Sequence, residues 1–321
     1  MELVAADIGG THCRFAIATR HGDGRITLSD AAKLTVADHA SLQTAFEAYR
    51  EGLGRPAPRH AAIGVAAPVE GELLKLTNNP WVIRPAMTAE RLGLDSALLV
   101  NDFAAVAHAV AVCGPDDLAH LAGPGRNLPA NGVVSVIGPG TGLGAAILLT
   151  GAQPRVIATE GGHVDFAPLD SLEDMLLDHL RARFPRVSVE RVVAGPGLAN
   201  ILSALAAIEG RAVPARDDKA LWEAALVEKD PLAKAAFDRW CLALGSIVGD
   251  LALAQGADAV VLAGGMLPRV QHLLPTSGFH ARFLAKGRFQ ARMAELPILR
   301  ITHPEPGLLG AAAAFFAAGE S

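Results

Sequence analysis

Residues 3–17 read LVAADIGGTHCRFAI, and residues 133–147 read VVSVIGPGTGLGAAI. In each stretch an apolar strand enters a turn of glycine and threonine, and a second apolar strand follows directly. Glycine has no Cβ, so the backbone N–H groups of such a turn can converge on an anion such as a phosphate. Two turns of this kind in one chain indicate two regions that contact one polyphosphate.

The composition is typical of a two-domain protein of the cytoplasm. The chain has 321 residues, and about 150 residues per domain is a common length. Charged residues make up 19% of the chain and the formal net charge is −5, so we expect neither nucleic acid nor an anionic membrane as a partner. No apolar run approaches the roughly 18 residues that span a bilayer. The three cysteines match no metal-ligand spacing, as expected in a reducing compartment, and they are Cys13, Cys113 and Cys241.

Strand-like and helix-like segments alternate along the chain, which indicates an α/β protein. Besides the two glycine hairpins, strands are predicted at 26–34, 60–65, 98–100, 155–159, 259–263 and 298–301. Helices are predicted at 41–53, 103–112, 172–183, 198–208, 221–227, 232–255 and 308–317. The segment 123–132 is rich in Gly, Pro and Asn, and we expect a domain boundary in this region.

The second turn also fits a dinucleotide-binding pattern, because residues 140–145 follow GxGxx[GA] and Glu160 lies about 20 residues further on. That fingerprint requires a helix after the turn, whereas a strand is predicted here. A Walker-type phosphate loop is disfavoured too, because no Lys-Ser or Lys-Thr pair follows the glycines. A tight hairpin without a ligand stays open for either turn alone. The pair of turns, together with Gly264 and Gly265 after a buried strand, favours phosphate binding.

Asp7 lies at the exit of the first apolar strand. A carboxylate in such a buried position needs a partner or a metal ion. We predict that Asp7 holds a magnesium ion through water beside the phosphates. The alternative is that it caps the turn.

Several longer motifs follow one another in order. They are DIGGT at 7–11, LTNNPW at 76–81, NDF at 101–103, GPGTGLG at 138–144, EGGHVDFAP at 160–168, ERVVAGPGL at 190–198 and PGLLG at 306–310. Together they resemble the bacterial ATP-dependent glucokinase family over essentially the whole chain. The resemblance implies an α/β protein with the two-lobe, ribonuclease H-like fold of actin-like ATPases and a cleft between the lobes. The small domain is expected at 1–112 plus 302–321, and the large domain at 113–301.

Transfer of a phosphoryl group to a sugar hydroxyl needs a group that accepts the hydroxyl proton. Asp102 suits this role because it is expected at a strand end and a helix start. The resemblance implies that it is the catalytic base. Capping of the helix by Asn101 or Asp102 is the alternative.

A sugar site needs carboxylates and amides, because each hydroxyl both donates and accepts hydrogen bonds. The resemblance assigns the glucose hydroxyls to Asn101, Asp102, Glu160, His163 and Glu190. Taken alone, His163 would be a structural histidine and Glu190 a solvated glutamate at a helix start. We predict that ATP and Mg²⁺ are bound by the two glycine turns and the later glycine pair, namely by Asp7, Gly9, Gly10, Thr11, Gly138, Gly140, Thr141, Gly142, Gly264 and Gly265.

The sequence therefore predicts a kinase that makes glucose 6-phosphate from glucose and Mg-ATP, and the resemblance suggests a homodimer. Mannose, fructose or an N-acetylhexosamine as the acceptor stays open, and so does ADP or polyphosphate as the donor. A sugar sensor without catalysis is a further alternative, although such a protein would need no base. A valine in place of Gly142 is expected to weaken nucleotide binding more than sugar binding.

Overall fold

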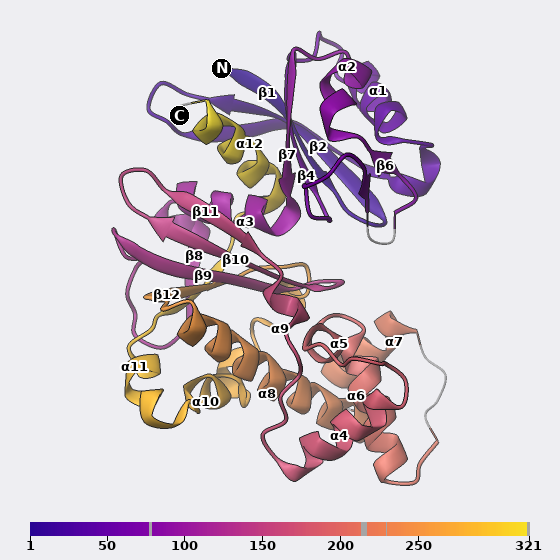
Figure 1. Ribbon diagram of the computed structural model, residues 1–321, viewed down its shortest axis with the longest axis vertical. Coiled ribbons are helices and arrows are strands. Elements are labelled where there is room, and N and C mark those ends of the chain that lie inside the picture. The colour runs from indigo at the N-terminus through magenta and orange to yellow at the C-terminus, as the bar shows by residue number, and fades with distance from the viewer. Residues whose placement is uncertain (77–78, 213–216, 229, 320–321) are drawn as a thin grey trace. The chain divides into compact units, whose positions relative to one another are not determined.

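The computed structural model describes residues 1–76, 79–212, 217–228 and 230–319, and the chain forms two compact units (Figure 1). Unit 1 consists of residues 1–118, 154–158 and 301–321. Unit 2 consists of residues 119–153 and 159–300. Residues 77 and 78 of the LTNNPW motif lie outside the described residues.

Unit 1 is built on a five-stranded sheet with the strand order β3-β2-β1-β4-β7. Its strands are β1 (Glu2–Ile8), β2 (His12–Arg20), β3 (Ile26–Thr35), β4 (His60–Val65) and β7 (Ser96–Asn101). The first three form antiparallel pairs, whereas β4 runs parallel to both β1 and β7. Ile8 is in register with Val65, and Val65 with Asn101, so the three parallel strands end at one edge of the sheet.

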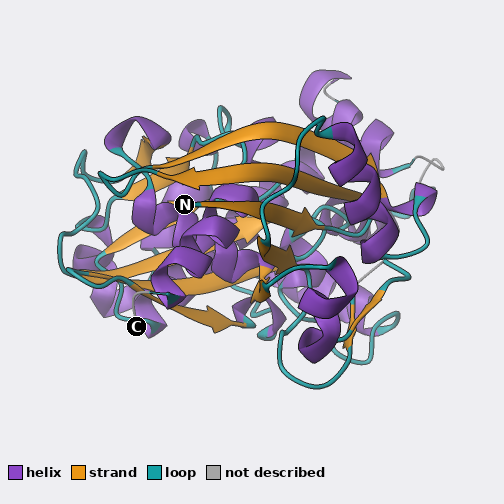
Figure 2. Ribbon diagram, turned by 90° about the horizontal axis from the view of Figure 1, so that it is seen from above, coloured by secondary structure: helices purple, strands orange, loops and turns teal. Residues whose placement is uncertain are grey.

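Both faces of this sheet are covered, because its strands contribute to two separate apolar cores. The strands are drawn in orange in Figure 2. The helices of unit 1 are α1 (Leu42–Gly52), α2 (Thr88–Leu92), α3 (Asp102–Val112) and α12 (Pro306–Ala318), and a short hairpin joins β5 (Leu74–Lys75) to β6 (Val82–Ile83). Alternate residues of β1 point to opposite faces. Val4 and Ile8 therefore pack in the core that contains residues of α1, while Leu3 and Ala5 pack in the core that contains α3 and α12.

The C-terminal helix α12 lies against α3 in unit 1. The two helices approach so closely at Gly310 that a Cβ there would overlap the carbonyl group of Ala105. Glycine is therefore required at this crossing. The packing of α12 against α3 therefore holds in place the helix whose first residue is Asp102.

The second sheet has six strands in the order β11-β10-β9-β12-β13-β8. They are β8 (Leu118–Ala122), β9 (Gly132–Pro139), β10 (Leu143–Thr150), β11 (Arg155–Thr159), β12 (Ala259–Leu262) and β13 (Ile298–Ile301). β9 and β10 form an antiparallel hairpin, and β12 runs parallel to β9 with Leu262 in register with Ile137. The second sheet thus repeats the arrangement of β1, β2 and β4, a hairpin followed by a parallel strand.

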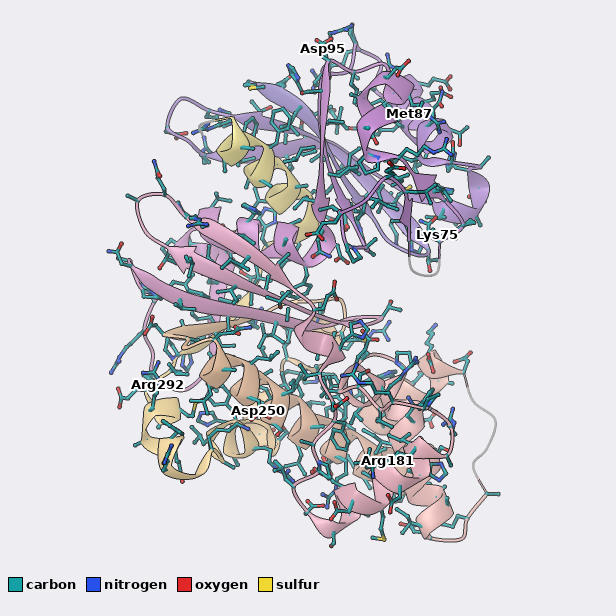
Figure 3. All side chains as sticks on the ribbon, in the orientation of Figure 1. Lys75, Met87, Asp95, Arg181, Asp250 and Arg292 are labelled. Atoms are coloured by element: carbon teal, nitrogen blue, oxygen red, sulfur yellow. The ribbon has the colours of Figure 1, made fainter. Side chains whose placement is uncertain are left out.

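Helices pack beside this sheet around one large apolar core, and side chains fill the space among them in Figure 3. The helices are α4 (Ser171–Arg181), α5 (Glu190–Val193), α6 (Gly197–Ile208), α7 (Asp218–Glu223), α8 (Pro231–Ala254), α9 (Leu267–Val270), α10 (Phe279–Leu284) and α11 (Gln290–Ala294). Trp240 of α8 is fully buried, with its ring centre 5.4 Å from that of Trp222 and 6.0 Å from that of Phe237.

The predicted glycine hairpins and long helices are confirmed. The helix predicted at 221–227 begins earlier, at Asp218, because the Asp217 side chain caps it by accepting from the N–H of Ala220 at 2.7 Å, and a π-helical turn follows at Ala224–Glu228. The sequence patterns gave no range for several short elements, which are β5, β6, β8, α2, α5, α9, α10 and α11, although a helix start was considered at Glu190. No helix in the described ranges is long and apolar enough to cross a membrane.

Candidate active site

The first glycine turn joins β1 to β2 and closes on itself, because the N–H of Gly9 donates to the carbonyl of His12 at 3.0 Å. Asn79, which is 9% exposed, donates from its side-chain amide to the carbonyl of Gly9 at 2.9 Å. Within the described residues, the N–H groups of Gly10 and Thr11 at the tip make no hydrogen bond. They are therefore available to an anion.

Asp7 lies just before this turn and forms an ion pair with Arg14 of β2, with 3.3 Å between Oδ2 and Nη1. Glu305 contacts the same guanidinium at 3.6 Å. Burial raises the pKa of Asp7, and the charge of Arg14 opposes that effect. A Cβ at Gly307 would lie 2.9 Å from Cγ of Asp7, so the start of α12 approaches the carboxylate closely.

Asn101 and Asp102 connect the end of β7 to α3. The Asn101 side-chain oxygen accepts from the N–H groups of Phe103 and Ala104, both at 3.0 Å, so Asn101 is the N-cap of the helix. Its amide group donates to the carbonyl of Ala67 at 3.4 Å. Asp102 is the first helical residue, and its Oδ1 accepts from the N–H of Phe103 at 2.8 Å. The capping alternative therefore holds for Asn101, and Asp102 lies at a helix N-terminus, where negative charge is favoured.

The register of the sheet brings these groups of unit 1 to one edge. β1, β4 and β7 end together, so Asp7 and the first glycine turn lie at the same edge as Asn101 and Asp102. Ligands of open α/β sheets bind outside the carboxyl ends of parallel strands. The sequence motifs identified these residues, but they gave no sign that Arg14 pairs with Asp7 or that Glu305 contacts the same guanidinium.

The second glycine turn, in unit 2, is held from two sides. Gly140 donates its N–H to the carbonyl of Gly142 at 2.8 Å, and Gly195 donates to the carbonyl of Gly140 at 2.8 Å. The later glycine pair lies against the same turn, because Gly264 adopts a φ of +93° and a Cβ there would be 2.5 Å from the carbonyl oxygen of Pro139. In the described part of the chain the N–H groups of Thr141 and Gly142 make no hydrogen bond.

The residues expected to bind sugar gather near this turn. Glu190 is the first residue of α5, and its Oε2 accepts from the N–H of Leu143 at 3.0 Å. Glu160 precedes the short 3-10 helix η4 (Gly161–His163) and His163 is its last residue, with 3.9 Å between carboxylate and ring nitrogen. Both side chains are more than half exposed, which leaves them accessible to a ligand.

Each unit thus carries part of the predicted set. Unit 1 brings together Asp7, Gly9–Thr11, Asn101 and Asp102. Unit 2 brings together the second turn, the later glycine pair and Glu190, with Glu160 and His163 on the segment that follows β11. The described residues contain no group of three or more His, Cys, Asp or Glu side chains that could hold a metal ion.

Comparison with known proteins gives full-length matches. The family model for glucokinase matches residues 4–318. The glucokinase of Zymomonas mobilis is 57% identical over 316 residues, covering 98% of each chain, and that of Stenotrophomonas maltophilia strain K279a is 41% identical, covering 97% of this chain and 94% of the relative. Among solved structures, a glucokinase from an Antarctic psychrotroph aligns with a TM-score of 0.85 at 33% identity over 98% of both chains.

More distant structures share the fold. A ROK family glucokinase from Streptomyces griseus, solved in complex with glucose and AMPPNP, aligns with a TM-score of 0.66 at 21% identity over 98% of this chain and 99% of that one. These structural likenesses confirm the predicted α/β fold of the actin-like ATPases.

Proposed function

Because this chain belongs to the glucokinase family, we propose that it transfers the γ-phosphoryl group of ATP to the 6-hydroxyl of glucose, giving glucose 6-phosphate and ADP. The observation that carries the proposal is the position of Asp102 in unit 1. It begins α3 at the sheet edge where the first glycine turn also lies. A proton acceptor and a phosphate-binding turn at one edge are parts that phosphoryl transfer to a hydroxyl requires.

Asp102 would act as the base. It would accept the proton of the 6-hydroxyl as the new bond from oxygen to phosphorus forms and the bond to the ADP oxygen breaks. The hydrogen bond from the N–H of Phe103 fixes the direction of the carboxylate, and the N-terminus of α3 favours its negative charge. A sugar sensor without catalysis would need no group of this kind.

The sugar hydroxyls would be held by carboxylates, an imidazole and an amide. Glu160 and Glu190 can each accept hydrogen bonds from hydroxyls, and His163 can donate or accept. The oxygen of Asn101 is engaged in capping α3, so this residue would contribute through its amide N–H. Asp102 would contact the hydroxyl that reacts.

The phosphates would be held by backbone donors at both glycine turns. In unit 1 these are the N–H groups of Gly10 and Thr11, with Gly9 shaping the turn. In unit 2 they are those of Thr141 and Gly142, and the turn is shaped by Gly138 and Gly140 and supported by Gly264 and Gly265. Glycine permits the close approach of backbone to phosphate that such contacts need.

Mg²⁺ would accompany the nucleotide and neutralise charge that develops on the phosphates. The residues fit an ion held mainly by phosphate oxygens and water, because the Asp7 carboxylate beside the first turn is already paired with Arg14 and the described residues contain no group of three or more side chains that could hold a metal ion. Asp7 would hold a water molecule of the ion, as Mg²⁺ keeps several of its waters in such sites.

We also propose a homodimer, as the resemblance implies, and a location in the cytoplasm. All three cysteines are free, which suits a reducing compartment, and ATP is abundant there. Light scattering on the purified protein would determine the number of chains in the assembly.

The proposed reaction is tested by a coupled assay with Mg-ATP and a panel of glucose, mannose, fructose, galactose and N-acetylglucosamine. We expect glucose-dependent release of ADP that is matched one to one by glucose 6-phosphate. ADP and polyphosphate are offered as donors in parallel reactions. If a sugar phosphate forms only from a sugar other than glucose, that sugar is the acceptor. Absence of sugar phosphate with every sugar and every donor would contradict the proposal.

A further inference from the structure

Glu190 is joined directly to the second glycine turn. Its Oε2 accepts a hydrogen bond of 3.0 Å from the N–H of Leu143, the first residue after the turn. This bond exists only because residue 142 is a glycine, since a Cβ there would overlap the same carboxylate oxygen and lie 3.3 Å from the carboxylate carbon. The side-chain oxygen occupies the space that a larger residue would need.

The short helix that carries Glu190 is attached to the same turn at its other end. α5 has four residues, and no side chain caps its start. Just after it, the N–H of Gly195 donates to the carbonyl of Gly140 at 2.8 Å. The carbonyl of Gly195 in turn accepts from the indole N–H of Trp222 at 3.1 Å. The turn therefore holds both the side chain of Glu190 and the backbone that follows it.

The segment with Glu160 and His163 packs against the first residues of β10, the strand that follows the second glycine turn. A Cβ at Gly162 would overlap the carbonyl group of Leu143, and the hydroxyl of Thr159 donates to the carbonyl of Ala145 at 2.9 Å. The first residues of β10 thus support both groups of unit 2 that would face the sugar, and in the turn before them the N–H groups of Thr141 and Gly142 make no hydrogen bond within the described residues.

We propose that Gly142 and the N–H of Leu143 position the carboxylate of Glu190 for sugar, so that residue 142 determines affinity for the sugar as well as shaping the phosphate turn. This inference rests on the proposed glucokinase reaction. One carboxylate oxygen is fixed by a charge-assisted hydrogen bond, and the other is then oriented to accept from a sugar hydroxyl. Gly142 and Leu143 are positioning residues in this scheme, because they act through Glu190.

This inference differs from the expectation based on sequence, in which a larger residue at position 142 weakens nucleotide binding more than sugar binding. In Gly142→Ala the added methyl group displaces the far end of a flexible side chain and no backbone atom, so the fold tolerates it. The Glu190 carboxylate must then leave the N–H of Leu143. We expect the KM for glucose to rise about tenfold or more, with the KM for ATP changed by less than about twofold.

The test is a double-mutant cycle with Gly142→Ala, Glu190→Asp and the double variant, read as kcat/KM for glucose and KM for ATP. The aspartate is one methylene shorter, so its carboxylate no longer reaches the space beside residue 142. We expect Gly142→Ala to cost about tenfold in the native background and less than about twofold beside Glu190→Asp. Gly125→Ala is the matched control, because no atom lies within 4 Å of a Cβ there, and it should leave all constants unchanged.

Two results would overturn the inference. One is a rise in the KM for ATP as large as that for glucose in Gly142→Ala, which would make residue 142 a nucleotide determinant only. The other is full additivity in the cycle, which would show that the methyl group does not act through Glu190. Both can occur while the native protein phosphorylates glucose, whereas failure of the native protein in the sugar panel would instead reject the proposed function.

Discussion

Asp102 is the residue on which the proposed chemistry depends most. In Asp102→Asn the amide oxygen can still accept from the N–H of Phe103, so α3 keeps its start, but the side chain can no longer take a proton. We expect kcat to fall by about 10²–10⁴-fold, which is the usual contribution of a general base, with little change in thermal stability. Steady-state kinetics and a melting curve on the same preparation measure both quantities.

The control for this substitution is Asp116→Asn, an exposed aspartate of unit 1 that precedes β8. The substitution removes one negative charge from the same unit, at a position beyond the C-terminal end of α3, whereas Asp102 is the first residue of that helix. We therefore expect kcat to be unchanged. Near-native turnover of folded Asp102→Asn would mean that another group accepts the proton.

Sequence motifs identified Asp7, Asn101 and Asp102 because each follows a predicted strand. They could not identify Glu305 as a neighbour, since it reaches Arg14 only when the C-terminal segment returns to unit 1. Arg14 is different, because it lies directly opposite Asp7 in the predicted hairpin, and the register of the two strands could have indicated that pair. For Asn101 the sequence left two roles open, and the hydrogen bonds from the N–H groups of Phe103 and Ala104 show that its side-chain oxygen caps the helix. Side-chain partners far apart in the chain are a property of tertiary packing, which local pattern does not encode.

At the scale of elements, Asp170 holds three helices of unit 2 together. Its Oδ1 accepts from the N–H of Glu173 at 2.9 Å, which caps α4. Its Oδ2 accepts from Arg239 of α8 at 2.6 Å and from Arg282 of α10 at 3.0 Å. Burial acts to raise the pKa of Asp170, but the N–H of Glu173 and the charge of Arg239 more than offset it, and the pKa lies below its usual value.

The lowered pKa sets the direction of a pH effect on stability. The charged carboxylate contributes stability above the unfolded pKa, about 3.9, and that contribution is lost as the pH falls through the lower folded value. We expect Asp170→Asn to reduce the free energy of unfolding at pH 7 by about 1–2 kcal/mol, less than for a fully buried pair because this carboxylate is partly exposed. Below about pH 4 the difference in free energy of unfolding between the native protein and Asp170→Asn should become smaller.

Chemical denaturation at pH 7 and at pH 3 measures this difference. Asp178→Asn is the matched control on the same helix, because its side chain is 77% exposed and lies 3.5 Å from Arg181, and such a pair contributes little. An equal loss of stability in Asp170→Asn at both pH values would show that the hydrogen bonds, and not the charge, stabilise this junction.

Elements were predictable where they are long or strongly marked. α8 and the two hairpins have a clear period or a glycine turn, and α1 begins after Ser41, whose hydroxyl accepts from the N–H of Thr44 at 3.2 Å. Elements such as α5 and α9 have four residues each, too few to show a helical period. α5 nevertheless carries Glu190, so a residue proposed to bind sugar lies on an element for which the sequence suggested no more than a helix start.

At the scale of the whole molecule, the division of the chain depends on pairings that local sequence does not show. The resemblance implies that residues 302–321 belong with the N-terminal domain, and the compact unit 1 consists of residues 1–118, 154–158 and 301–321. The short segment 154–158 is also grouped with unit 1, which no composition signal indicates. The precise domain limits expected from the sequence stay a prediction that limited proteolysis can test.

The assignment of sugar ligands to both units makes a prediction for hydrogen exchange. Glucose at about one hundred times its Kd should stabilise the bound form by about 2.7 kcal/mol, so amides that exchange only through opening of the site should slow by about 100-fold. We expect this protection in peptides that contain the start of α3 in unit 1 and in peptides that contain 159–163 and 188–195 in unit 2. A panel sugar that yields no product serves as the control. Protection confined to unit 2 would show that Asn101 and Asp102 do not hold the sugar before ATP binds, because a ligand can stabilise only those parts of the chain whose native conformation its binding requires.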